Sequence, residues 1–138
     1  MRKRTQAREF ALQILYQLDI TGDKPESVLE NFWSHQAEDN IDNDLKEFAS
    51  ALVKGVAENI NSIDQKICQY ATNWQLERMA VVDRNVMRIG CFELLHRADI
   101  PPKVSINEAV ELAKRFSGID SGKFVNAILD KIKLEKNK

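Results

Sequence analysis

Apolar side chains recur along this chain at the three- and four-residue steps that mark one face of a helix. After Thr5 they form one stripe, which Gly22 ends: Ala7, Phe10, Ala11, Ile14, Leu15 and Leu18. A second stripe of the same kind covers residues 45–60 and is the longest in the sequence. The strict alternation of apolar and polar residues that indicates a strand is not convincing anywhere, so the pattern predicts an all-α fold.

Turn and capping residues divide the rest of the chain into further helices. Asp23 stands two residues before Pro25 and predicts the start of a short helix that carries Val28, Leu29, Phe32 and Trp33 inward. Ser62 and Ser105 each open a capping-box pattern, with Gln65 and Glu108 three residues later, and predict two helix starts.

Prolines and a glycine supply the remaining boundaries. The Pro101-Pro102 pair ends a helix over residues 82–95, and Gly118 closes the helix that Ser105 opens. A last helix runs from about Ser121, and the segments 35–44 and 73–74 are expected to be a loop and a turn. The chain of 138 residues is therefore expected to be a single domain, residues 1–138, with a compact bundle of about seven helices.

The composition favours a reduced cytoplasmic setting. Residues 1–20 contain no apolar secretory core, and no apolar run reaches the ~18 residues of a membrane span. Cys68 and Cys91 lack the spacing of a zinc or redox motif, so we expect two buried thiols.

Charge is distributed unevenly although the net charge is only -1. Residues 1–20 hold four cations and two acids, and residues 111–138 hold seven cations and four acids. Residues 21–66 hold four cations and ten acids. Such a division suits a protein that binds an anionic polymer with one surface and a basic partner with another.

Catalytic and metal-binding signatures are weak. The Ser121-Gly122-Lys123 triplet lacks the upstream glycine of a phosphate-binding loop. Cys91 and His96 are five residues apart and would point about 140° away from each other on a helix. Asp83 in a first helical turn is explained by the helix dipole alone. We therefore expect no enzyme activity, no metal and no cofactor.

The strongest candidate site is the basic start of the first helix. Arg2, Lys3, Arg4 and Arg8 occur without an intervening acid, and Arg4 and Arg8 share a helix face if the helix starts early enough to include both. Arginine forks and a helix N-terminus both suit phosphate. Four neutralised phosphates of a single strand would give a salt slope of roughly -3, which is about a 50-fold loss of affinity between 50 and 200 mM salt. The charge alone fits a solvated basic terminus equally well. Tyr16, beside the apolar stripe, could stack a base or close the edge of the core.

Four separated segments resemble the NusB family of transcription antitermination factors. They lie in the family's order over nearly the whole chain: residues 8–17, residues 83–90 with 93–95, residues 100–116 and residues 123–126. The resemblance implies an all-α fold of two small halves with three or four helices each. It also implies a non-enzymatic protein that binds the boxA element of nascent ribosomal RNA leaders. In the family this RNA is held jointly with the ribosomal protein NusE, within an antitermination complex on RNA polymerase.

The resemblance also assigns roles to individual residues. It implies phosphate contacts for the basic start, an RNA contact for Tyr16, and an acidic position near the RNA and partner face for Asp83. It further implies an RNA-facing turn made by Asp120, Lys123 and Phe124. Two departures are the short basic start, with Thr5 and Gln6 where the family can carry more arginine, and a divergent segment 34–47.

Other interpretations remain open at this point. A NusB-type domain also occurs fused to ribosomal RNA cytosine methyltransferases, but no catalytic domain follows in this sequence. A helical scaffold that binds only proteins would also carry solubilising basic ends. The sequence does not decide between a monomer and the homodimer that some family members form.

Overall fold

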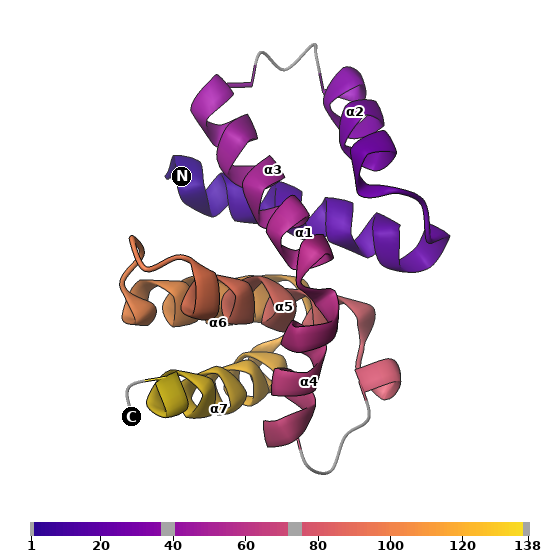
Figure 1. The fold of residues 1–138 in the computed structure, drawn as a ribbon. Coiled ribbons are helices and arrows are strands. Elements are labelled where there is room, and N and C mark those ends of the chain that lie inside the picture. Colours follow the sequence, from indigo (N-terminus) through magenta and orange to yellow (C-terminus); the bar gives the residue numbers. More distant parts are fainter. Residues whose placement is uncertain (1, 37–40, 72–75, 137–138) are drawn as a thin grey trace. The chain divides into compact units, whose positions relative to one another are not determined.

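The computed structural model describes residues 2–36, 41–71 and 76–136, and these residues form seven α-helices and one short 3₁₀ helix without any strand (Figure 1). The expected all-α class and the helix number are confirmed. The chain separates into two units, residues 1–58 and 59–138, with three and four α-helices. This matches the two small halves that the resemblance implied. The turn expected at Asn73 and Trp74 lies outside the described residues, as does part of the loop expected at 35–44.

The first unit contains α1 (Lys3–Thr21), α2 (Pro25–His35) and α3 (Asn43–Glu58). In Figure 1, α3 crosses α1, and α1 also contacts α2. The predicted apolar stripes of α1 and α3 both face the core of this unit. Their residues Ala7, Ile14, Leu52 and Val53 are all buried. Phe10, Phe32 and Trp33 add a cluster of edge-to-face rings with centroids 5.0 to 5.7 Å apart.

The second unit contains α4 (Ile60–Tyr70), the 3₁₀ helix η2 (Leu76–Arg78), α5 (Val81–His96), α6 (Pro102–Phe116) and α7 (Ile119–Lys136). Helix α5 is its centre and contacts α4, α6 and α7. Every residue from 85 to 94 is buried. Gly90 allows the close approach, because a Cβ atom there would lie 2.6 Å from Leu129 Cδ1 and 3.3 Å from Ala109 Cβ.

The two predicted capping boxes are wrong. Helix α4 begins at Ile60, so Ser62 lies inside it and its hydroxyl donates to the carbonyl oxygen of Asn59 at 3.1 Å. Helix α6 begins at Pro102, which places Ser105 inside that helix as well. Proline has a fixed φ and no amide hydrogen, so it is well suited to the first helical position and starts α6 before the serine can cap it.

Ser105 instead joins two helices in the core of the second unit. Its hydroxyl donates to Glu93 Oε1 on α5 at 2.8 Å, and both residues are only 1% exposed. The side chain that looked like a cap therefore helps to satisfy a buried carboxylate.

Other boundaries follow the sequence closely. Gly22 ends α1 at φ 71°, and its amide donates to the carbonyl oxygen of Leu18. Gly118 follows α6 at φ 128°, where a residue with a Cβ atom would be strained. Helix α2 begins at Pro25 as expected, but Lys24 and not Asp23 occupies the capping position. Helix α7 begins two residues before Ser121.

The two cysteines differ in their exposure. Cys91 is buried as expected, whereas the expectation of a buried Cys68 is wrong, because its side chain is exposed on α4. Burial raises the pKa of the Cys91 thiol to about 12. None of the described helices is long and apolar enough to span a lipid bilayer.

Candidate nucleic-acid interface

The first unit presents three cations at the first turn of α1. Arg2 caps the helix with extended backbone angles, and Lys3 and Arg4 are the first helical residues. All three side chains are exposed, and the first turn contains no acidic residue. The positive end of the helix dipole and these cations therefore act at the same place.

Arg8 differs from these three cations because it is buried. It is 2% exposed, although it lies only one turn after Arg4. Both guanidinium groups lie over the ring of Phe48 on α3, with Cζ 4.5 Å from the ring centroid for Arg4 and 5.3 Å for Arg8. The prediction that Arg4 and Arg8 share a helix face is confirmed. Of the four cations predicted to contact phosphate, three are exposed: Arg2, Lys3 and Arg4.

Lys3 is paired with a carboxylate from the segment that leads into α3. Its Nζ atom lies 3.0 Å from Asp42 Oδ2. The hydrogen bond between them raises the pKa of Lys3 and lowers the pKa of Asp42, with the backbone amide of Asp44 as a second donor to Asp42. A phosphate group that binds Lys3 must compete with this carboxylate.

Tyr16 lies on the same helix and is 44% exposed. Twelve residues separate it from Arg4, which corresponds to about 18 Å along the helix axis. The helix therefore brings Tyr16 and the basic turn into one unit without bringing them into contact.

The second unit gathers three of the other predicted residues around one pocket. Asp83 from the first turn of α5 lines it together with Asp120 and Phe124 from the start of α7. The pocket has a volume of about 390 Å³, and its remaining lining residues are Arg78, Met79, Ala80 and Ser121. Lys123 is exposed on α7 and is not one of the lining residues.

Asp83 has only one of its two carboxylate oxygens paired. Oδ2 accepts a hydrogen bond from Ser121 Oγ at 3.1 Å, which links α5 to α7. Oδ1 is buried and has no hydrogen-bond partner among the described residues. Ser121 is not among the predicted site residues, because its sequence context indicates the start of a helix and only an incomplete phosphate-binding loop. Nothing in the spacing alone relates it to Asp83.

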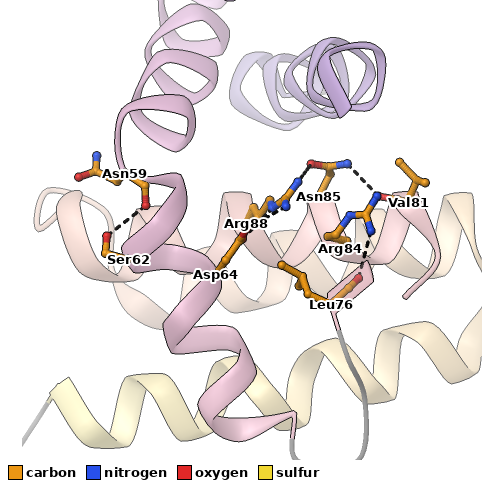
Figure 2. A network of polar contacts seen from close by, with 8 residues as sticks. All are labelled: Asn59, Ser62, Asp64, Leu76, Val81, Arg84, Asn85 and Arg88. Atoms are coloured by element: carbon orange, nitrogen blue, oxygen red, sulfur yellow. Dashed lines mark hydrogen bonds and ion pairs between the residues drawn. The ribbon is translucent and has the colours of Figure 1, made fainter. Parts of the chain in front are cut away.

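A polar network fixes the first turns of α5, on which Asp83 lies (Figure 2). Arg88 donates to both carboxylate oxygens of Asp64 on α4 at 2.8 and 2.9 Å, and also to Asn85 Oδ1 at 3.1 Å. Asn85 donates in turn to the carbonyl oxygen of Val81. Figure 2 shows the Arg88 side chain between Asp64 and Asn85.

Arg84 attaches the same part of α5 to the short helix before it. Its guanidinium donates to the carbonyl oxygen of Leu76 in η2 at 3.0 Å. Arg78, the last residue of η2, and Met79 after it line the pocket. The bond from Arg84 thus joins η2 to α5, the helix that supplies Asp83 to the same pocket.

Among the described residues there is no cluster of three or more histidine, cysteine or acidic side chains that could hold a metal ion. His35 lies in the last turn of α2, with Nδ1 2.7 Å from the carbonyl oxygen of Asn31. His96 is the last residue of α5, and its ring stacks on Phe92. Neither ring contributes to the basic turn or to the pocket.

Comparison with known proteins gives a consistent result over the whole chain. A sequence model of the NusB family matches residues 5–133. The transcription antitermination protein NusB of Desulforapulum autotrophicum is 47% identical over 137 residues, which cover 99% of this chain and 95% of that protein. The protein of the same name from Myxococcus xanthus is 48% identical, with coverage of 100% and 99%.

Solved structures agree with these sequence matches. NusB of T. maritima superimposes with a TM-score of 0.86 at 40% identity, and the match covers 96% of this chain and 91% of the other. A chain in a crystal structure of the antitermination factors NusB and NusE in complex with double-stranded RNA superimposes with a TM-score of 0.85 at 32% identity. That match covers 98% of both chains. The chain described here belongs to the NusB family.

Proposed function

We propose that this chain is a non-enzymatic, cytoplasmic transcription factor that binds the boxA element of nascent ribosomal RNA leaders together with a NusE-type ribosomal protein. In this role it promotes transcription antitermination by RNA polymerase. Two relatives named as antitermination proteins align over nearly their full length, which supports this role. The solved NusB and NusE complex with double-stranded RNA supports both kinds of partner.

The observation that carries the proposal is the exposed basic turn, defined as Arg2, Lys3 and Arg4. Two arginine forks and one ammonium group next to backbone amides form a surface suited to the phosphates of a single strand. Because Arg8 is buried, three cations and not four are available. The expected salt slope of this turn is therefore roughly -2, or about a 20-fold loss of affinity between 50 and 200 mM salt.

The pocket of the second unit supplies different chemistry. Phe124 and Met79 offer apolar surface to a base, and Asp83 and Asp120 offer acceptors for base amino groups. Lys123, just outside the lining, suits a phosphate, and Tyr16 offers a ring for stacking in the first unit. In this proposal the basic turn gives affinity, and the pocket and Tyr16 give preference among bases.

In this proposal the protein partner binds the acidic part of the chain. Residues 21–66 carry ten acids against four cations, which suits a basic ribosomal protein and would disfavour RNA. Asp83, which lines the pocket, is expected to lie near the RNA and partner face.

Fluorescence anisotropy with a short boxA-like RNA and a scrambled RNA tests this function. Each RNA is titrated at several salt concentrations, with and without the NusE-type protein. We expect preference for the boxA-like RNA, and we expect the preference to sharpen with the partner. Equal or absent binding of both RNAs in the presence of the partner would contradict the proposal and favour a scaffold that binds only proteins.

Two variants connect the result to the basic turn. Arg4→Ala is expected to weaken RNA binding and to reduce the magnitude of the salt slope by about 0.7. Lys54→Ala removes an exposed cation from α3, away from the basic turn, and serves as the matched control. A similar loss in both variants would indicate that net charge and not this surface is responsible.

A further inference from the structure

Phe48 is the residue beneath Arg4, one of the two exposed arginines of the basic turn. It comes from α3, is 8% exposed, and has the guanidinium groups of both Arg4 and Arg8 over its ring. Arg8 is buried against this ring, whereas Arg4 reaches solvent. The ring therefore supports an exposed guanidinium from a fixed position in the core of the first unit.

The ring restrains Arg4 in a different way from a carboxylate. A guanidinium held over an aromatic face interacts through its plane, so the N–H groups at its edge stay available for a bidentate phosphate contact. A carboxylate would occupy those donors, as Asp42 does with the ammonium group of Lys3. Lys3 and Arg4 are both held in place, but in different ways. The carboxylate of Asp42 occupies a donor of Lys3, whereas the Phe48 ring holds Arg4 without occupying its N–H donors.

Order in the free protein lowers the cost of binding. A long side chain that is immobilised on binding loses rotamer freedom, and this loss subtracts from the affinity. If the side chain is already held in place, much of that loss has occurred on folding. A contact of this kind at an exposed site corresponds to a factor of about two to five in an equilibrium constant.

We infer that Phe48 is a positioning residue for RNA binding, which holds the Arg4 guanidinium over its ring with the donor edge available to a phosphate. This inference rests on the proposed function. It assigns a role in RNA binding to a buried side chain of α3 that contacts no RNA in the proposed arrangement.

Phe48→Leu tests the inference, because it keeps apolar bulk and removes the aromatic face. Phe48→Tyr retains the ring and is the conservative variant. Phe32→Leu removes an aromatic ring of the same unit that packs edge-on against Phe10 and Trp33, and it controls for a general effect of losing an aromatic ring from this unit. Affinity for the boxA-like RNA and denaturant unfolding are measured for each full-length variant.

We expect Phe48→Leu to weaken RNA binding about two- to fivefold, with Phe48→Tyr close to the parent protein and Phe32→Leu without effect on affinity. The decisive measurement is the double-mutant cycle with Arg4→Ala. In the Arg4→Ala background, Phe48→Leu should have no further effect on affinity.

Three results would overturn the inference, and one of them also affects the proposed function. If Phe48→Leu weakens binding equally in both backgrounds, its effect is structural and does not pass through Arg4. If Phe48→Leu leaves affinity unchanged while Arg4→Ala weakens it, the ring does not position the arginine but the phosphate contact stands. If Arg4→Ala itself leaves affinity unchanged, the phosphate contact proposed for Arg4 fails together with the inference.

Discussion

Ser105 on α6 donates its hydroxyl hydrogen to the carboxylate of Glu93 on α5, at a site in the second unit from which water is nearly excluded. Ser105→Ala removes this donor and leaves a buried acceptor with one partner fewer. We expect the free energy of unfolding to fall by about 1 to 3 kcal/mol. Denaturant unfolding measures the change, and Ser62→Ala is the control because its hydroxyl is exposed on α4. An equal loss in the two variants would show that the buried bond adds nothing.

Arg8→Ala is expected to act on stability. The buried aliphatic stem and guanidinium pack against Phe48, so truncation leaves a cavity and should cost about 1 to 3 kcal/mol of unfolding free energy. Arg4→Ala, one turn earlier and exposed, should leave unfolding nearly unchanged and reduce RNA affinity instead. Unfolding and RNA titration of both variants check this division, and a stable Arg8→Ala protein with a reduced salt slope would refute it.

Asp42→Asn is expected to strengthen RNA binding. Asp42 occupies Lys3 through an exposed ion pair, and the neutral amide would no longer compete with phosphate for that ammonium group. Anisotropy titration with the boxA-like RNA measures the gain in affinity, and the salt slope should stay near the roughly -2 expected for three phosphate contacts. Asp23→Asn, which removes a carboxylate at the end of α1, is the charge-matched control. Equal gains in the two variants would point to net charge alone.

Thiol labelling should separate the two cysteines. Cys68 is exposed and Cys91 is buried. In a labelling reaction at pH 8, Cys68 should react with a thiol reagent in the folded protein, whereas Cys91 should react only after unfolding. The pKa of Cys91 is raised to about 12 by burial, so the folded state keeps the proton that the unfolded state releases at lower pH. The stability linked to this thiol is thus complete below the unfolded pKa of about 8.5 and declines as the pH rises from there toward 12. Labelling of Cys91 as fast as Cys68 in the folded protein would contradict this.

Gly90→Ala should destabilise the second unit. The new methyl group would lie 2.6 Å from Leu129 Cδ1, in a region where Leu129 itself is completely buried. Overpacking of this kind costs about 1 to 3 kcal/mol. Gly90→Ala combined with Leu129→Ala tests the cause, because the smaller neighbour should remove part of the penalty. If the penalty is unchanged in the Leu129→Ala background, another contact is responsible.

The apolar pattern was sufficient to predict the fold because each helix has a stripe that the core requires. Helix starts were harder to predict. A serine followed three residues later by a glutamate or glutamine fits a cap, but it fits the interior of a helix equally well. For Ser105 the start was determined by Pro102, three residues earlier. Helix α4 begins at Ile60, with a single residue between it and the end of α3, and that residue, Asn59 at the N-cap, makes no side-chain capping bond.

The candidate site was predictable where it depends on neighbours along the chain and not where it depends on distant ones. The cations of the first turn and the position of Asp83 can be read from the sequence. The burial of Arg8 cannot, because the ring that covers it lies 40 residues later on α3. The bond from Ser121 to Asp83 spans 38 residues and depends on how α5 and α7 pack.

The position of Phe48 has a consequence for work with fragments. A synthetic peptide of residues 2–21 would carry all four basic side chains but would lack the Phe48 ring beneath Arg4 and Arg8. Helices in proteins depend mostly on tertiary packing for their stability, so the isolated peptide would present a flexible set of charges. In the peptide Arg8 would be able to contact phosphate, so its RNA binding would depend more steeply on salt than that of the folded protein. Its selectivity among RNA sequences would be low. Such a peptide would therefore be a poor substitute for the folded protein in screening for inhibitors of RNA binding.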